Sequence, residues 1–266
     1  MNQFVFKEFK LILSEAVHLL IKNPVLFIPK LLIAFFYGVG TLFAMGLARE
    51  LYSFTSFTTE QMLSFDFSAF FSLALLLMGF TIFTFFLDLF LSGLYPIWVK
   101  LALKKKLSFS KGFELFKPKI IPVFFAGVLL WFLITVVSMI ESFLLIYFDL
   151  SEVGIVFSFL ITFLFAFLFY FLYPKIVFEN NGVKENFRSS ILDSIKNKKL
   201  VFLLSIIPLF VSILKFVLAY FSNELVFLIS FWVLVIATGF VYSLHVVVNQ
   251  IAYEKLFSKN TRSSKK

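Results

Sequence analysis

The sequence predicts an all-α, polytopic membrane protein whose six transmembrane helices form three repeated hairpins. The first observation is composition: 61% of the 266 residues are hydrophobic and 15% are charged, whereas apolar residues make up about half of a soluble protein. The second is a series of six long apolar stretches. The third is a one-sided distribution of basic residues. The 43 phenylalanines suit surfaces that face lipid chains.

The six apolar stretches each have the length of a membrane span. A helix needs about 20 apolar residues to cross a hydrocarbon core of roughly 30 Å. The stretches run approximately over residues 24–48, 70–95, 120–140, 153–173, 200–221 and 225–245. Barrel strands would instead show about 10 residues of alternating polarity, and these stretches are apolar on every side. Six crossings place both termini on one side of the membrane.

The basic residues indicate which side that is. Of the 24 Lys and Arg residues, all except Arg49 and Lys215 fall on the side of the termini. Because loops rich in Lys and Arg stay in the cytoplasm, we expect a multi-pass protein of the cell membrane with both termini cytoplasmic. The net charge of +9 is then a signal of topology, and the sequence does not predict nucleic-acid binding.

Two Tyr-Pro pairs indicate an internal repeat. Tyr95-Pro96 and Tyr173-Pro174 lie 78 residues apart, at the cytoplasmic ends of the second and fourth spans. Proline removes a backbone donor and clashes with the carbonyl four residues earlier, so both prolines are predicted to break a helix. The chain is expected to be a single membrane domain, 1–266. Its repeat units are about 1–95, 96–173 and 174–250, with a basic tail at 254–266.

Each hairpin is expected to follow an amphipathic helix at the cytoplasmic membrane surface. The three proposed apolar faces are Phe6, Phe9, Leu13, Val17 and Leu20; Phe109, Phe113 and Phe116; and Val183, Phe187, Ile191 and Ile195. Basic residues beside them would contact anionic lipid headgroups. These headgroup candidates are Lys104, Lys105, Lys106, Lys111, Lys117, Arg188, Lys196, Lys198 and Lys199.

Asp88 is the acidic residue that lies deep within a predicted span. A carboxylate at the centre of a membrane helix costs about 3 kcal/mol on insertion scales, so Asp88 should be protonated, paired, or facing protein or water. Other polar residues share its helical face or form a similar stripe in the sixth span. The polar core candidates are Asp88, Thr84, Ser92, Tyr95, Thr238, Tyr242 and His245. They predict either hydrogen bonds between helices or a path for a solute or proton.

Other chemistry is weakly represented. The chain has no cysteine and two histidines, so we expect no disulfide, metal site or cofactor. No phosphate-binding loop, nucleophile elbow or zinc motif is present, which predicts a non-enzyme. Lys30, near the start of the first span, is expected to extend its ammonium to the membrane surface, and His245 could likewise sit at the headgroup level.

The segment "YPKIVFENNGVKENFRSSILDSIKNKKLVFLLSIIPLF" from Tyr173 and the shorter "IKNPVLFIP" near the start carry a family resemblance. In both, the chain resembles six-helix proteins related to the glycerophosphoryl diester phosphodiesterase membrane domain, including prokaryotic relatives. The resemblance implies the six-helix topology. Hydrolase activity belongs to a separate soluble domain in that family, and nothing in this sequence matches its histidines or metal-binding acids.

Two functions follow as hypotheses. The first is a non-enzymatic membrane module that associates with lipids, with anionic headgroups at the cytoplasmic face, or with a membrane-protein partner. The second is a transporter or channel for a small solute or for protons that uses Asp88.

Overall fold

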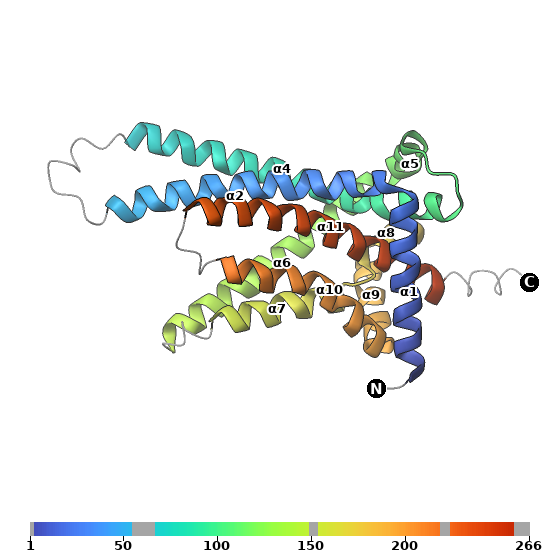
Figure 1. Ribbon diagram of the computed structural model, residues 1–266. Coiled ribbons are helices and arrows are strands. Elements are labelled where there is room, and N and C mark those ends of the chain that lie inside the picture. The colour runs from blue at the N-terminus through green and yellow to red at the C-terminus, as the bar shows by residue number, and fades with distance from the viewer. Residues whose placement is uncertain (1–2, 55–66, 149–153, 219–223, 258–266) are drawn as a thin grey trace, which may run out of the picture.

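The computed structural model describes residues 3–54, 67–148, 154–218 and 224–257, which are helical with short connections and contain no strand (Figure 1). Within these ranges, five segments are long and apolar enough to cross a membrane. They are Pro24–Arg49, Phe67–Leu103, Phe109–Leu145, Val156–Phe178 and Glu224–Phe257. The all-α class is therefore confirmed, together with a multi-pass membrane architecture. The basic tail beyond residue 257 lies outside the described residues.

The helices follow one another along the chain with few intervening residues. They are α1 (Gln3–Lys22), η1 (Pro24–Phe27), α2 (Ile28–Phe54), α4 (Phe67–Leu103), α5 (Phe109–Phe116), η2 (Lys117–Lys119), α6 (Ile120–Tyr147), α7 (Gly154–Leu168), α8 (Leu172–Phe178), α9 (Val183–Lys196), α10 (Lys198–Leu218) and α11 (Glu224–Phe257).

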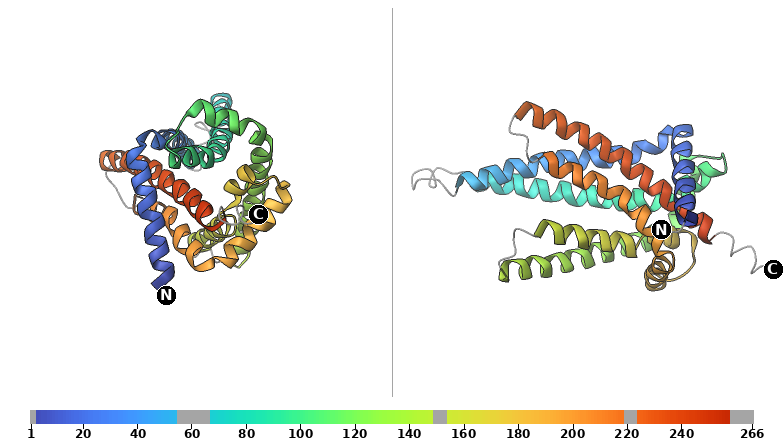
Figure 2. Two further views of the ribbon diagram at one scale, coloured as in Figure 1. Left: turned by 90° about the vertical axis from the view of Figure 1, so that its right-hand side faces the viewer. Right: turned by 60° about the horizontal axis from the view of Figure 1, so that its bottom comes forward.

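The long helices form a ring when the bundle is viewed along its axis (Figure 2). Neighbours in the ring are α2, α4, α6, α7, α10 and α11, and α11 returns to pack on α2. The short helices α5, α8 and α9 gather at one end of the bundle, where α1 crosses α10 and α11 (Figure 1). We call this the basal end.

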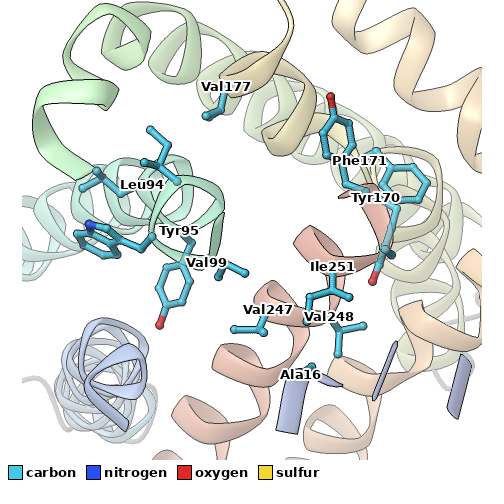
Figure 3. Packing of buried hydrophobic residues seen from close by; sticks show 14 of the residues in the cluster. Ala16, Leu94, Tyr95, Val99, Tyr170, Phe171, Val177, Val247, Val248 and Ile251 are labelled. Carbon is cyan, nitrogen blue, oxygen red and sulfur yellow. The ribbon is translucent and has the colours of Figure 1, made fainter. Parts of the chain in front are cut away.

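Most of the buried hydrophobic side chains lie at the basal end (Figure 3). Leu94, Tyr95 and Val99 of α4 belong to this cluster, as do Phe171 and Ile251, and each of them is at most 1% exposed. Along the rest of the ring many large side chains point outward and are exposed, in keeping with a lipid solvent in which apolar surface needs no cover. The basal core thus holds the helices together, and the ring beyond it is more loosely packed.

The expected helix break at Pro96 is not found. α4 continues through Pro96 to Leu103, because Ile97, Trp98 and Val99 are buried in the basal core. Full burial of such side chains contributes about 1.5–3 kcal/mol each, which together exceeds the roughly 3 kcal/mol that an interior proline costs. The chain turns instead at Lys105, which has φ 56°.

At Pro174 the chain does leave the helix. α7 ends at Leu168 and α8 begins at Leu172, so Pro174 lies in the first helical turn, where its missing N–H is tolerated. The two Tyr-Pro pairs therefore occupy different backbone environments, although their sequences match.

The apolar faces of the short helices pack on protein more than the sequence suggested. In α5, Phe116 is buried, and the rings of Phe109 and Phe113 lie 4.8 Å and 6.1 Å from that of Trp98. In α1 the buried face is Ile12, Ala16, Leu19 and Leu20, whereas Phe6 and Val17, which were expected on the apolar face, are exposed. Of the expected face, Leu20 is in the core and Phe9 and Leu13 pack against it, so α1 carries apolar residues on more than one face.

Candidate ligand chamber

A cavity of about 750 Å³ lies inside the ring, between the basal core and the far end of the bundle. Residues of α2, α4, α6, α7, α8 and α11 line it. Its volume falls within the roughly 300–1,000 Å³ of small-molecule sites. We call this cavity the chamber.

An ion pair between α2 and α4 forms one wall of the chamber. Lys30 Nζ lies 2.6 Å from Asp88 Oδ1 and donates a second hydrogen bond, of 2.8 Å, to Ser92 Oγ. Ser92 Oγ in turn donates to Asp88 Oδ1 at 3.2 Å. The Lys30 side chain is 8% exposed and that of Asp88 is 31% exposed, so the carboxylate is the more open of the two charges.

Three tyrosines line the same chamber as this carboxylate. They are Tyr37 of α2, Tyr173 of α8 and Tyr242 of α11. Their rings and hydroxyl groups give the polar part of the chamber an aromatic wall. Tyrosine can present both a hydrogen-bonding group and a π face to a ligand.

Two buried polar atoms at the chamber wall have no hydrogen-bond partner among the described residues. They are Nδ1 of His245 and the hydroxyl of Tyr170. Nearby, the side-chain amide of Asn249 donates to the backbone carbonyl of Tyr170. That carbonyl precedes Pro174 by four residues, so no helical N–H is available to it. The helix break at Pro174 thereby creates a polar position on the chamber wall.

The chamber is amphipathic along the bundle axis. On α2 its lining runs from Lys30, nearest the basal end, to Met45 at the far side; on α11 it runs from Asn249 to Phe227 in the same sense. The ion pair, His245 and the tyrosines therefore lie in the basal half. Apolar side chains dominate the far half, among them Met45, Leu130, Ile134, Phe227 and Phe231.

The structure separates the seven polar core candidates into two groups. Those that line the chamber are Asp88, Ser92, Thr238, Tyr242 and His245. Thr84 instead donates to the carbonyl of Phe80 within α4. Tyr95 is buried in the basal core and donates to the carbonyl of Leu26.

Sequence reasoning missed Lys30 as a site residue. Its ammonium does not extend to the membrane surface; it is buried and paired with Asp88, 58 residues later in the sequence. One signal could have found it: the small and polar residues of the first span recur at helical spacing and form a single face of α2. They are Lys30, Ala34, Tyr37, Gly38 and Thr41, and all of them line the chamber.

The nine headgroup candidates form a separate, exposed set. They follow α4 or belong to α5, η2, α9 and the start of α10, so they surround the basal end, and every one of them is exposed. A second ion cluster there was not anticipated. Lys175, whose side chain is 4% exposed, pairs with Glu179 at 3.0 Å and with Asp193 at 2.7 Å, and Tyr253 donates to Glu179 at 3.2 Å.

No group of three or more His, Cys, Asp or Glu side chains that could hold a metal ion occurs within the described ranges. No family model matches the chain, and neither the curated proteins nor the solved structures contain a significant match to it. The geometry of the chamber is therefore the basis on which function is argued.

Proposed function

We propose that the protein is a non-catalytic, multi-pass protein of the cell membrane that binds a lipid-like amphiphile in the chamber. Both termini are cytoplasmic in this proposal, and the basal end faces the cytoplasm. The single observation that carries it is the amphipathic lining: the ion pair, His245, Tyr173 and Tyr242 lie toward the basal end, and mainly apolar side chains lie toward the far end. A lipid of the cytoplasmic leaflet has the same polarity along the membrane normal.

The proposal includes six spans in three repeated units. α10 is a 21-residue helix of mainly apolar sequence that packs beside α7 and α11 in the ring, so we take it as the sixth crossing. The corners before α2 and α10 support the repeat. Asn23 and Asn197 each donate a side-chain hydrogen bond to the carbonyl four residues earlier, at 3.0 Å and 2.9 Å.

The exposed bases at the basal end would hold that end against anionic headgroups. Each Lys or Arg near a charged membrane surface contributes about 1 kcal/mol. Exposed apolar residues of α1, including Phe4 and Ile21, which are 75% and 70% exposed, would enter the boundary between headgroups and lipid chains. The basal end would then gather anionic lipids around itself, close to the polar half of the chamber.

A substitution that fills the chamber tests the proposal. Ala166 of α7 lines the chamber, so Ala166→Trp should displace a bound amphiphile because the indole fills part of the cavity. The measurement is native mass spectrometry of the protein purified in mild detergent, with identification of co-purified lipids. Ala48→Trp is the matched control, because Ala48 is exposed and does not line the chamber. Equal lipid retention by the two variants would refute binding in the chamber.

A second candidate is a carrier of a small solute or of protons that uses Asp88. The observation in its favour is that the Asp88 carboxylate is 31% exposed while its partner Lys30 is nearly covered, which leaves an ionisable group accessible from the chamber. Asp88→Asn should then abolish proton or solute flux in proteoliposomes while folded protein is retained. Unchanged flux would remove this candidate.

A further inference from the structure

We propose that the chamber selects a zwitterionic amphiphile whose headgroup carries one ammonium and one phosphate. This inference rests on the proposed function, because it names the class of ligand that the chamber takes. The observations behind it are the charge balance of the chamber, the unequal exposure of its two charges and its aromatic wall.

Charge balance is the first step. The charges of Lys30 and Asp88 cancel, and they are 2.6 Å apart within the bundle. A singly charged ligand would leave one net charge in this low-dielectric space, and an unpaired buried ion costs several kcal/mol. A zwitterion keeps the net charge at zero while offering a partner to each protein charge. An uncharged headgroup also keeps it at zero, but it pairs with neither.

The geometry of the pair gives each half of the headgroup a position. Asp88 is the more open charge, so the ligand ammonium would lie against its carboxylate. Tyr37, Tyr173 and Tyr242 line the same cavity, and aromatic faces attract ammonium groups. The Lys30 ammonium has three hydrogens, of which Asp88 and Ser92 engage two. The third is left for a phosphate oxygen.

Two unpartnered polar atoms belong to residues that line the chamber. Nδ1 of His245 and the Tyr170 hydroxyl are buried at the chamber wall without a hydrogen-bond partner among the described residues. Such atoms are costly unless something bonds to them. The Tyr170 hydroxyl can donate to a phosphate oxygen, and an imidazole nitrogen can donate or accept according to its protonation. Because almost no surface of either atom is exposed, each would reach a headgroup only after its side chain turns toward the chamber.

The apolar half distinguishes an amphiphile from a small zwitterion such as an amino acid. Phe227, Phe231 and Met45 line space that a free headgroup would leave empty. A hydrocarbon chain in this space would gain about 0.8 kcal/mol per methylene if it came from water. A volume of 750 Å³ suits one chain together with its headgroup.

The test compares four single-chain amphiphiles of equal chain length. Purified full-length protein in a non-ionic detergent is titrated with a lysophosphatidylethanolamine, a lysophosphatidic acid, an alkylammonium and a monoacylglycerol, and occupancy is measured by native mass spectrometry. Glycerophosphoethanolamine, which has the headgroup without the chain, is the fifth ligand. The zwitterionic lysolipid should bind about tenfold tighter than each of the others, a difference of about 1.4 kcal/mol. Equal binding of all four amphiphiles, preference for any other, or tight binding of the chainless compound would overturn the inference.

Charge variants give a readout that a purely structural role would not change. Asp88→Asn leaves Lys30 unpaired and should shift the preference to the anionic lysolipid. Lys30→Gln leaves the Asp88 carboxylate without its ammonium partner and should shift the preference to the alkylammonium. If these variants do not fold, Lys30→Met combined with Asp88→Leu keeps the chamber neutral and should lose headgroup selectivity. A retained preference for the zwitterion in the double variant would overturn the inference.

The outcome also separates this inference from the proposed function. If the four amphiphiles bind equally to the wild type and Ala166→Trp abolishes all binding, the chamber binds amphiphiles and the zwitterion inference fails. If Ala166→Trp binds every amphiphile as the wild type does, the ligand lies elsewhere and the proposed function fails.

Discussion

Single residues decide what the interior of this bundle can hold. A buried ion pair recovers its desolvation cost only when further hydrogen bonds satisfy both partners. Here Ser92 does this, since it accepts from Lys30 at 2.8 Å and donates to Asp88 at 3.2 Å. The three groups form a closed triangle on the chamber wall. The exposed part of the Asp88 carboxylate is accessible to a ligand in the chamber.

The pair makes a prediction about stability. Lys30→Met should destabilise the protein by about 3 kcal/mol, because it leaves the Asp88 charge unpaired inside the bundle. The double variant Lys30→Met, Asp88→Leu should recover much of this loss, since it removes both charges. Thermal unfolding in detergent, followed by circular dichroism, measures the difference. A double variant that is less stable than the single one would contradict this account of the pair.

At the scale of elements, close helix contacts depend on glycine. A Cβ at Gly239 of α11 would lie 2.8 Å from the backbone Cα of Leu31 in α2, so the two helices approach each other through that position. Small residues at helix crossings are a common means of association between membrane helices. Gly79 of α4, in contrast, has open surroundings, since a Cβ added there would meet no atom within 4 Å.

These two glycines form a matched test. Gly239→Ala should lower the melting temperature by several degrees, because the backbone of α2 cannot yield as a side chain would. Gly79→Ala should be neutral or stabilising by up to about 1 kcal/mol, because alanine has the higher helix propensity. Thermal unfolding of both variants in the same detergent decides the matter. A Gly239→Ala protein as stable as the wild type would show that the α2–α11 contact is looser than described.

The Lys175 cluster joins α8, α9 and α11 at the basal end. Lys175→Met leaves the carboxylates of Glu179 and Asp193 without the ammonium that lies 3.0 Å and 2.7 Å away, and their repulsion should loosen the α8–α9 connection. We expect faster cleavage by chymotrypsin in this region, detected by mass spectrometry of the fragments. Lys184→Met, at an exposed position, is the control and should be cleaved at the wild-type rate.

At the scale of the whole molecule, the basal end and the far end differ in packing and charge. The basal end holds the hydrophobic core and the nine exposed headgroup candidates. The ring beyond it exposes large apolar side chains such as Leu76 and Phe143, at 64% and 68%. This division fits one end in water at the membrane surface and the rest among lipid chains.

The absence of cysteine makes topology directly measurable. Single variants Lys106→Cys and Lys198→Cys should react with an impermeant thiol reagent only when the cytoplasmic side is opened. Glu224→Cys, at the other end of the α10–α11 hairpin, should react from the outside. Labelling of Glu224→Cys from the same side as Lys198→Cys would show that α10 does not cross the membrane and would remove the sixth span.

The sequence by itself determined the helical class and the membrane character, because both depend on local composition. It also singled out Asp88, because a charge inside a membrane span is costly in lipid. It placed the ends of spans less well. α4 continues past Pro96 because its next residues are buried by α5 and by the basal core, and a local rule for proline cannot include that gain.

Only the tertiary structure decided that Lys30 is the partner of Asp88 and that Tyr37, Tyr173 and Tyr242 line the same chamber. These residues come from α2, α4, α8 and α11, and helical periodicity within one segment specifies a face but not the neighbour that the face meets. Pairing between segments arises from packing and from the mutual neutralisation of distant charges, which no single stretch of sequence contains.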